Sequence, residues 1–393
     1  MNTQMTRSEK LLSGLNLQAE VGIEIGALDK PIIPPSTPHV FYVDHAETEV
    51  LRSKYQGDPY VNVDELVQVH GVWGEASLAQ AAARVAPVDF VIASHVLEHV
   101  PDLIAWLREL ASVLKPRGEV RLAIPDRRYT FDVLRGETRA ADVLASHLAG
   151  ARRPQAREIL DYMTHMVGVD TWKIWDGSQD TASLTRQCSI EGSMAVARDS
   201  ADNGNYHDVH CWVFTPLSFA VLMHDLASAA YHPFKCAGYF PTEHNTNEFF
   251  VTLQLCGDAE VAAASWKQLQ QTIETQLDAQ ARELREAHAR EIRALDAHLL
   301  QAQAQVEVAQ AQVGAAQAQV NDAHAREALS QALRLQEGRA AEVARLALAE
   351  TVAASEVQIA GLTNNVAQLR ASTSWRITAP VRAMGSWLRR FRH

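Results

Sequence analysis

The stretch that decides the fold of this chain is Val21-Gly-Ile-Glu-Ile-Gly-Ala-Leu28. Its apolar first half predicts a buried strand, and Gly26 permits a tight turn that brings the backbone close to a ligand. Glu24 places a carboxylate near the end of this strand, where it can hold a cationic amino group. The next apolar run ends at Asp44, and an acid at the tip of a second strand can accept both ribose hydroxyls of a nucleoside.

Short apolar runs alternate with helical patterns through the first half of the chain. This alternation predicts βαβ units and a doubly wound, mostly parallel α/β sheet, in which ligands bind beyond the carboxyl ends of the strands. The expected strands are Val21–Ile25, Val40–Val43, Tyr60–Val63, Phe90–Ala93 and Glu119–Ile124.

The turn after the first strand lacks the G-x-G-x-x-G pattern of a dinucleotide site. Asp29, three residues after Gly26, would also repel a pyrophosphate. An adenosyl sulfonium with an amino-acid tail carries no pyrophosphate. The turn therefore favours S-adenosylmethionine over a nicotinamide dinucleotide.

A resemblance to a known family becomes specific further along the chain. Asp89-Phe-Val-Ile-Ala-Ser-His-Val-Leu-Glu-His-Val-Pro-Asp102 resembles the fourth-strand region of class I S-adenosylmethionine-dependent methyltransferases of the type 11 group. Leu114-Lys-Pro-Arg-Gly118 resembles their turn before the fifth strand, and Glu24-Ile-Gly26 their first motif, with Leu28 in place of a further glycine. The resemblance implies a seven-stranded, Rossmann-like methyltransferase sheet within residues 1–258, closed by an antiparallel strand pair at Phe234–Phe240 and Glu248–Leu255.

The resemblance also implies which residues meet the cofactor. Glu24 and Gly26 would contact the methionine moiety, Asp44 the ribose, and the loop Trp73-Gly-Glu-Ala-Ser77 the adenine. Ser94 and His95 would face the cofactor or the acceptor. The full predicted cofactor-binding set is Glu24, Gly26, Ala27, Asp44, Trp73, Gly74, Glu75, Ser94 and His95.

The string His95-Val-Leu-Glu98-His99 also matches the H-x-x-E-H pattern of one group of zinc peptidases. A zinc site of that kind needs both histidines on one helix face and a further ligand. His95 instead follows an apolar strand directly, and Pro101 comes just after His99, so a strand-to-helix junction is expected. No metal site is predicted. Glu98 and His99 are expected to organise the loop by hydrogen bonds, with a direct role in catalysis as the alternative.

Residues for the acceptor are expected at two places. Asp126-Arg-Arg128 follows the fifth strand, where the arginines could clamp a phosphate or carboxylate or could form ion pairs within a surface loop. Asp208 and His210, just before a helix that Thr215-Pro216 is expected to begin, could form a proton-abstracting pair or could only line the pocket. The predicted substrate-binding residues are Asp126, Arg127, Arg128 and Tyr206, and the predicted catalytic residues are Asp208, His210 and His95. Residues 135–205 form an insertion that is expected to serve as a lid or acceptor-binding region.

Residues 259–371 predict a long coiled coil or helix pair, because they lack proline and, after Trp266, aromatic residues. The pentamer Ala-Gln-Ala-Gln-Val recurs at 302–306, 309–313 and 316–320, each copy seven residues after the last. This heptad register places Ile292, Leu299, Val306, Val313 and Val320 at one core position and Leu295, Ala302, Ala309, Ala316 and Ala323 at the other. The alternative is a single exposed helix or partial disorder.

Residues 372–393 combine tryptophan, phenylalanine and aliphatic residues with arginines and contain no acid. Such a basic amphipathic tail suits a membrane surface or a partner protein, although it could also pair with the acidic body. Ser372-Thr-Ser-Trp-Arg-Ile-Thr-Ala-Pro380 resembles the ending of many bacterial glycosyltransferases and methyltransferases of surface-polysaccharide assembly. The resemblance implies a peripheral position at the inner membrane.

The composition bounds the function further. A net charge of −11 disfavours nucleic acid as a partner, and four cysteines without C-x-x-C spacing, no signal peptide and no long apolar stretch predict a cytoplasmic protein. Together with the resemblance, the sequence predicts methyl transfer from S-adenosylmethionine to an acceptor hydroxyl of a sugar or glycan in O-antigen or capsule biosynthesis. The coiled coil would make a homo-oligomer or hold a glycosyltransferase. The alternatives are a small-molecule or lipid-quinone methyltransferase and a non-catalytic scaffold.

Overall fold

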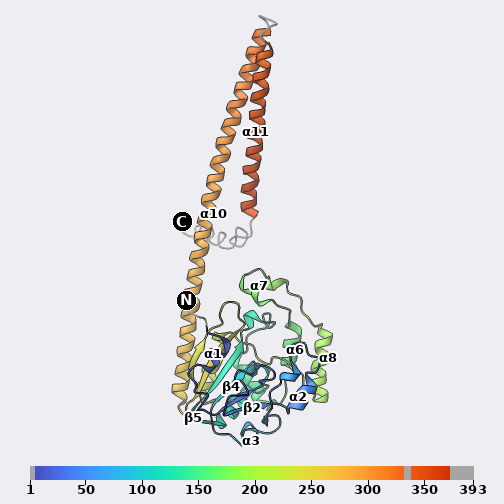
Figure 1. The fold of residues 1–393 in the computed structure, drawn as a ribbon, viewed down its shortest axis with the longest axis vertical. Helices are drawn as coiled ribbons and strands as arrows, with labels where there is room; N and C mark the ends of the chain where they lie inside the picture. Colours follow the sequence, from blue (N-terminus) through green and yellow to red (C-terminus); the bar gives the residue numbers. More distant parts are fainter. Residues whose placement is uncertain (1–4, 332–337, 372–393) are drawn as a thin grey trace. The chain divides into compact units, whose positions relative to one another are not determined.

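The computed structural model of the protein describes residues 5–331 and 338–371. The chain divides into two compact units, Met1–Gln276 and Leu277–His393. The first unit contains a seven-stranded sheet with helices packed against it, and the described part of the second unit is helical (Figure 1).

The sheet has the strand order β3-β2-β1-β4-β5-β7-β6. The first five strands run parallel, whereas β7 is antiparallel to both β5 and β6, so the sheet is mixed. Its strands are β1 (Gly22–Ile25), β2 (Val40–Asp44), β3 (Gly71–Val72), β4 (Val88–Ser94), β5 (Leu114–Pro125), β6 (Phe234–Phe240) and β7 (Glu248–Leu255). The predicted strands around Ile23, Val43, Phe90 and Val120 and the closing antiparallel pair are confirmed.

The predicted strand at Tyr60–Val63 is wrong. Tyr60 is 81% exposed, and Val63–Glu65 forms a 3-10 turn, η1. The strand beside β2 is instead the two-residue β3, whose Gly71 pairs with Val43. An added Cβ at Gly71 would lie 2.3 Å from the carbonyl oxygen of Ala81, so only glycine fits there.

Alternate residues of the central strands enter two different hydrophobic clusters, as expected for a sheet covered on both faces. Ile23 and Ile25 of β1 pack in the large cluster with residues of α4, α9 and α10. Ile92 of β4 faces the opposite way and packs with Leu11 of α1 and with Ile33. The N-terminal helix α1 and the segment around Ile33 therefore cover the second face.

The helices of the first unit lie before, between and after the strands of this mixed sheet. They are α1 (Arg7–Leu12), α2 (Thr48–Lys54), α3 (Leu78–Ala81), α4 (Leu103–Ser112), α5 (Ala140–Leu148), α6 (Ala156–His165), α7 (Thr171–Trp175), α8 (Ile190–Arg198), α9 (Pro216–Ser228) and the first turns of α10 (Ala259–Gln331). Short turns lie at η2 (Leu97–His99), η3 (Arg127–Tyr129), η4 (Thr181–Ser183) and the π-helical η5 (Asp199–Asn203). The insertion at 135–205 is mainly helical, and Thr215 caps α9 as predicted, accepting a hydrogen bond from the Ser218 amide.

The first unit continues beyond the boundary predicted at residue 258. Trp266 of α10 is fully buried, and its indole nitrogen donates to the carbonyl oxygen of Phe234 at 2.9 Å. Ala262, Leu269 and Ile273, at helical spacing, belong to the same core cluster. The beginning of α10 is therefore part of the sheet's core, and the unit ends at Gln276.

In the second unit the rest of α10 and α11 (Gly338–Ala371) lie side by side, as Figure 1 shows. Arg345 of α11 contacts His324 of α10 at 3.3 Å between Nη1 and Nε2. Ala309, Ala316 and Val320, all at predicted heptad core positions, are among the least exposed residues of the arm. The described residues of the arm, 277–331 and 338–371, therefore form two paired helices. The coiled coil and its role in oligomerisation stay predictions.

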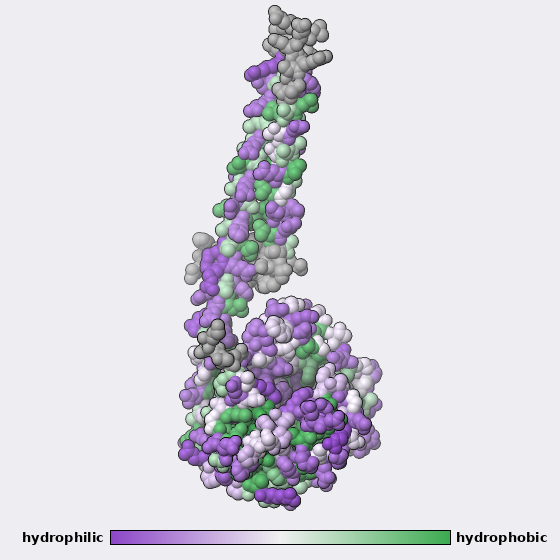
Figure 2. Space-filling view, viewed as in Figure 1, coloured by the Kyte–Doolittle hydropathy of each residue, from purple (hydrophilic) through white to green (hydrophobic). Residues whose placement is uncertain are grey.

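Surface polarity differs little between the units. Figure 2 shows polar residues over much of the visible face of the first unit, with apolar residues in small patches, and a mixture of both along the arm. Within the described ranges, no helix offers an apolar stretch sufficient to cross a bilayer. The predicted amphipathic tail, residues 372–393, lies outside the described residues.

Candidate functional site

The turn after β1 lies against the segment that follows β4. Gly26 has φ +68°, a conformation that favours glycine, and its amide donates to the carbonyl oxygen of Val43 at 3.0 Å. A Cβ at Gly26 would come within 3.0 Å of Cγ2 of Val96. The first two parallel strands and β4 thus meet at their carboxyl ends, the edge of the sheet where ligands bind in this architecture.

Glu24 is fully engaged within the protein. Its two carboxylate oxygens accept hydrogen bonds from the amides of Ile32 at 2.6 Å and Ile33 at 3.0 Å, and the residue is 2% exposed. Burial raises the pKa of Glu24 to about 7, although the two amide donors act in the opposite direction. The carboxylate therefore holds the loop that follows the turn. Its predicted contact with the amino group of the cofactor stays a prediction.

Asp44 lies at the tip of β2, beside the loop predicted to meet adenine. Its Oδ1 accepts from the His45 amide at 2.7 Å and contacts His45 Nδ1 at 2.6 Å, and its backbone carbonyl accepts from the Trp73 amide at 2.8 Å. A Cβ on Gly74 would lie 3.2 Å from the carbonyl oxygen of His45. Among the described contacts Oδ2 of Asp44 has no hydrogen-bond partner, so it remains able to accept from ribose hydroxyls.

The loop itself is fastened to α4. Trp73 Nε1 donates to Glu109 Oε2 at 2.8 Å, and the Trp73 ring stacks on Trp106 with centroids 6.3 Å apart. Glu75 is exposed, whereas Ala27 is buried against Tyr42 and Val67. The indole of Trp73 thus anchors the loop, and the predicted contacts of Trp73, Gly74 and Glu75 with adenine stay predictions.

The end of β4 carries a polar network that the sequence did not predict. Ser94 accepts a hydrogen bond from the guanidinium of Arg7, which also donates to Glu248 Oε1 at 2.7 Å. His95 Nε2 lies 2.8 Å from Glu248 Oε2. Burial raises the pKa of Glu248, but His95 and Arg7 outweigh it and hold this pKa below its usual value. Arg7 and Glu248 come from opposite ends of the first unit, so no local pattern could have indicated them.

Backbone hydrogen bonds attach the segment around His210 to η2. The carbonyl oxygen of Glu98 accepts from the amides of Cys211 at 2.7 Å and Trp212 at 3.2 Å. The indole nitrogen of Trp212, which is 1% exposed, donates to the carbonyl oxygen of Val100 at 2.7 Å. These bonds hold His210 opposite Glu98 and His99, just beyond the end of β4.

His210 pairs with Asp132, and not with Asp208 as predicted. His210 Nδ1 lies 2.6 Å from Asp132 Oδ2, and Arg135 donates to Asp132 Oδ1 at 2.9 Å and to Asp161 at 2.9 Å. Burial would raise the pKa of Asp132, but His210 and Arg135 lower it. The prediction failed because Asp132 follows η3 and is brought to His210 only by the tertiary fold.

Asp208 pairs instead with His99, at 2.8 Å between Oδ1 and Nδ1, and accepts from the Tyr206 hydroxyl at 3.2 Å. Burial would raise the pKa of Asp208, but His99, Lys54 and Tyr206 lower it to about 2. Lys54 connects this segment with the cofactor edge, because its Nζ lies 3.1 Å from Nε2 of His45, the neighbour of Asp44, and 6.0 Å from the centroid of the Tyr206 ring. The predicted cofactor edge at Asp44 and the predicted acceptor segment at Asp208 are therefore neighbours.

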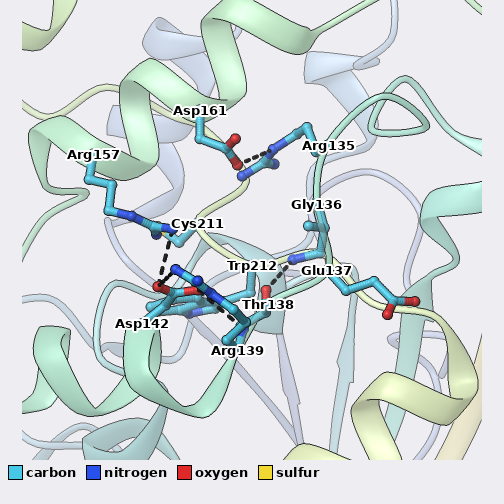
Figure 3. A pocket seen from close by; sticks show the side chains of 11 residues that line it. Arg135, Gly136, Glu137, Thr138, Arg139, Asp142, Arg157, Asp161, Cys211 and Trp212 are labelled. Carbon is cyan, nitrogen blue, oxygen red and sulfur yellow. Dashed lines mark hydrogen bonds and ion pairs between the residues drawn. The ribbon is translucent and has the colours of Figure 1, made fainter.

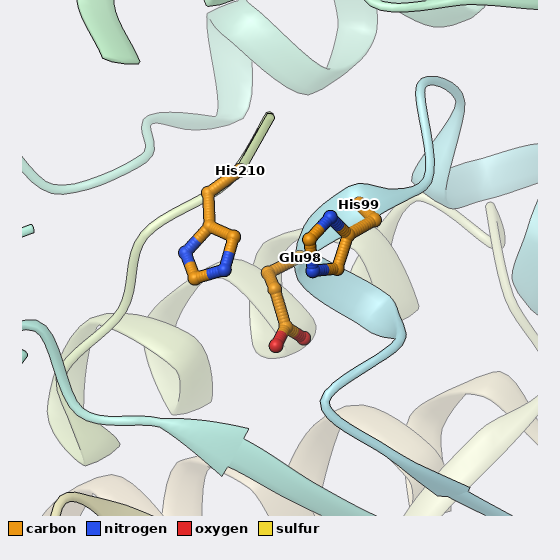
Figure 4. Close-up of side chains that lie close together, drawn as sticks. All are labelled: Glu98, His99 and His210. Carbon is orange, nitrogen blue, oxygen red and sulfur yellow. The ribbon is translucent and has the colours of Figure 1, made fainter. Parts of the chain in front are cut away.

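Glu98, His99 and His210 converge in space, as Figure 4 shows. One potential ligand atom from each of the three lies within 4.8 Å of the other two. Glu98 is 1% exposed, and neither of its carboxylate oxygens receives a hydrogen bond from any residue in the described ranges. Sequence analysis singled out Glu98 and His99 but did not connect them with His210. The Glu98 backbone organises the loop as expected, whereas its carboxylate does not.

The predicted arginine clamp forms ion pairs within its own loop. Arg128 donates two hydrogen bonds to each carboxylate oxygen of Asp126. The same carboxylate accepts a hydrogen bond from the Thr242 hydroxyl at 2.7 Å. Arg127 donates to the carbonyl oxygen of Val133 at 2.7 Å. Asp126 is fully buried, so its role here is to hold the loop after β5. Of the two alternatives for this loop, internal pairing is what the structure has, and binding of the acceptor by these residues stays a prediction.

Two cavities lie near this network. One of about 280 Å³ is lined by residues of the 135–142 loop, α6 and the segment after His210, and Figure 3 shows Arg157 and Arg139 meeting Asp142 there. Arg135 and Asp161, which continue the His210–Asp132 pair, also line it. The other, of about 290 Å³, lies between α1 and the start of β7 and is lined by Arg7, His244 and Glu248 among others. Asp44 and Glu24 line neither cavity.

No curated protein matches the chain. Among solved structures, the chain resembles the CcbJ methyltransferase from Streptomyces caelestis (12% identity over 63% of this chain and 94% of that one, TM-score 0.33) and an S-adenosylmethionine-dependent methyltransferase from Mesorhizobium loti (11%, 63% and 97%, TM-score 0.30). It also resembles the carbon methyltransferase CurJ, at 14% identity over 63% of this chain and 51% of that one, with a TM-score of 0.31.

A family model described as a methyltransferase domain matches residues 22–226, just over half of the chain. The matched range begins at β1 and ends within α9, so it contains Gly26, Asp44, Glu98 and His210. The chain therefore belongs to this family of methyltransferase domains and is an S-adenosylmethionine-dependent methyltransferase.

Proposed function

We propose that this methyltransferase acts on a hydroxyl group of a sugar or glycan in the biosynthesis of a bacterial surface polysaccharide. The observation that carries the hydroxyl assignment is the pairing of His210 with Asp132 beyond the end of β4. Because Asp132 takes up Nδ1, the lone pair of His210 is left on Nε2, on the side of Glu98 and His99. The lone pair on Nε2 can accept the proton of an acceptor hydroxyl directly. Alternatively, it can bind a cation that activates the hydroxyl.

The residues at the carboxyl ends of β1 and β2 fit the cofactor. Gly26 leaves room where a side chain would meet Val96, and Asp44 offers a carboxylate oxygen to the ribose. S-adenosylmethionine supplies an electrophilic methyl group when it is bound. Transfer would form a bond from the acceptor oxygen to that carbon and break the bond from sulfur to carbon, with the electron pair left on sulfur. The histidines would take up the hydroxyl proton. The main task of the chain is to align the oxygen with the methyl carbon.

One observation supports a sugar over an apolar acceptor. The cavity beside Arg135 is lined by charged side chains, among them Arg139 and Arg157, which can donate hydrogen bonds to hydroxyl or phosphate oxygens.

The place in polysaccharide assembly rests on the tail. Ser372–Pro380 resembles the ending of enzymes of that assembly, and the arginine-rich segment after it suits the anionic surface of the inner membrane. The paired helices of the arm would then hold a second copy of the chain or a glycosyltransferase. These partners are part of the proposal.

The test is radiolabelled methyl transfer from S-adenosylmethionine into a whole-cell extract, followed by separation into lipid, glycan and protein fractions. Label in the glycan fraction, released as an O-methyl sugar on acid hydrolysis, is the expected result. Label confined to quinones or other small molecules would contradict the glycan assignment and favour the small-molecule alternative.

A further inference from the structure

Glu98 has a buried carboxyl group to which no described residue donates a hydrogen bond. The side chain is 1% exposed, and both of its oxygens lack a donor among the described residues. The nearest basic side chain is His95, whose Nδ1 is 3.7 Å from Glu98 Oε1, beyond hydrogen-bond distance. Burying a carboxylate without a hydrogen-bond donor costs several kcal/mol unless a cation accompanies it. We therefore expect a cation beside Glu98.

The two neighbouring histidines are oriented as metal ligands are. Asp132 holds His210 at Nδ1 by a hydrogen bond, and Asp208 lies 2.8 Å from Nδ1 of His99 in an ion pair without hydrogen-bond geometry. Nε2 of each ring is left available. Metal-binding histidines commonly carry such a carboxylate on their second nitrogen, because it fixes the ring and raises its basicity. Figure 4 shows a nitrogen of each ring directed toward the Glu98 carboxylate.

The distances suit a first-row cation. Ligand atoms that lie about 2.1 Å from a tetrahedral zinc ion are separated from one another by roughly 3.4 Å. In the structure the three ligand atoms lie within 4.8 Å, so small side-chain rotations bring them onto one ion. The backbone bonds from Cys211 and Trp212 to the Glu98 carbonyl hold both sides of the site in place before any ion binds.

We propose that Glu98, His99 and His210 bind a divalent first-row transition-metal cation such as Zn²⁺. Two imidazoles and one carboxylate are the donor set of catalytic zinc sites and leave at least one coordination position open. This inference rests on the proposed function and deepens it. The open position binds the acceptor hydroxyl, and the cation lowers the pKa of that hydroxyl so that His95, the next base, removes the proton.

The test is titration of the full-length, metal-free protein with Co²⁺ alone, followed by visible absorption. The wild type is expected to bind one Co²⁺ per chain, and Glu98→Gln and His210→Ala are expected to lower the affinity at least tenfold. Two matched controls lie outside the cluster. His147→Gln removes another histidine paired with a carboxylate, Asp102 at 2.9 Å, and Glu158→Gln another buried acid with an unpartnered oxygen. Both controls should bind like the wild type.

Thermal melting separates loss of the site from misfolding. Without metal, Glu98→Gln should melt no lower than the wild type, because it replaces a buried carboxyl group that receives no hydrogen bond. Added Co²⁺ should raise the melting temperature of the wild type and not that of Glu98→Gln. No saturable uptake by the wild type, or equal affinity in Glu98→Gln and His210→Ala, would overturn the metal site.

Activity distinguishes this inference from the proposed function. If metal-free enzyme transfers label to glycan as fast as metal-loaded enzyme, the cation has no part in activating the acceptor, while the proposed function stands. If the protein binds Co²⁺ through these residues but labels no glycan under any metal condition, the glycan assignment fails and the site remains.

Discussion

The Nδ1 atom of His210 lies 2.6 Å from Oδ2 of Asp132, and the two residues come from segments on either side of the helical insertion. Arg135, itself 1% exposed, holds the other oxygen of Asp132 at 2.9 Å. The carboxylate thus orients the ring from within the core. The site's chemistry depends on that orientation, because it decides which ring nitrogen faces the acceptor.

Asp132→Asn should keep the shape of this pair but remove its charge. Loss of a carboxylate on the second nitrogen of a metal-binding histidine typically lowers metal affinity 10- to 100-fold, and the same decrease is expected for Co²⁺ here. The measurement is the Co²⁺ titration by visible absorption, with a circular dichroism spectrum to verify folding. A folded Asp132→Asn protein that binds Co²⁺ as tightly as the wild type would show that Asp132 does not orient a ligand.

Asp44→Asn tests the ribose contact. Hydrogen bonds from a hydroxyl to an ionised carboxylate contribute about 1.5–3 kcal/mol, so the affinity for S-adenosylmethionine should fall at least tenfold. Isothermal titration calorimetry measures it. Asp64→Asn, an exposed acid in the nearby turn η1, is the matched control and should bind normally. Equal affinity in both variants would remove Asp44 from the cofactor site.

Gly26→Ala should impair cofactor binding beyond the effect of backbone strain. Its φ of +68° costs an alanine roughly 1–2 kcal/mol, and the new Cβ also meets Val96 at 3.0 Å. Gly14→Ala is matched in φ, at +80°, but its Cβ would meet nothing within 4 Å. Urea unfolding and calorimetry should show a comparable strain cost in both variants and weaker S-adenosylmethionine binding in Gly26→Ala alone. Weakened binding in both would point to a general loss of stability instead.

His232 predicts a loss of stability in acid. Its Nε2 donates to the Met223 carbonyl at 3.0 Å and its Nδ1 accepts from the Phe234 amide at 3.2 Å, so the neutral ring fills the site. Burial lowers the pKa of His232 to about 4, below the 6.5 of the unfolded chain. The unfolded state therefore binds the extra proton between these values. The contribution of the neutral His232 ring to the free energy of unfolding is complete above pH 6.5. It declines as the pH falls toward 4, by about 3 kcal/mol in all.

The measurement is the free energy of unfolding by urea at pH 7.0, 5.5 and 4.5, for the wild type and for His232→Asn. Other groups also titrate over this range, so the quantity to compare is the difference in the free energy of unfolding between the wild type and His232→Asn. It should shrink as the pH falls. A difference that stays constant with pH would mean that His232 is not buried in its neutral form.

The sequence predicted the sheet because each central strand is an apolar run buried on both faces. The exception, β3, has only two residues, Gly71 and Val72, which give no period to detect. Tyr60–Val63 has the composition of a strand but lies in an exposed loop. Its tyrosine and the neighbouring residues do not pack against a face of the sheet. The β-pairing of Gly71 beside Val43 depends on packing against Ala81, which no local pattern reveals.

The site could be predicted only in its local parts. Gly26 and Asp44 follow apolar runs directly, so their place at the edge of the sheet follows from chain order. The partners of His95 and His210 are Glu248 and Asp132, far away in the sequence, and tertiary folding alone brings each pair together. Asp208, close to His210 in the chain, was the wrong partner because His99 and Tyr206 occupy its carboxylate.

The measurement that tests the account most directly is the rate of methyl transfer to glycan by His210→Gln beside the control His147→Gln. His210→Gln should lower the rate at least 100-fold, the scale of a lost acid–base or metal-activating group, and should bind S-adenosylmethionine like the wild type. His147→Gln should transfer at the wild-type rate. Methyl transfer at the wild-type rate by a folded His210→Gln protein would contradict the account.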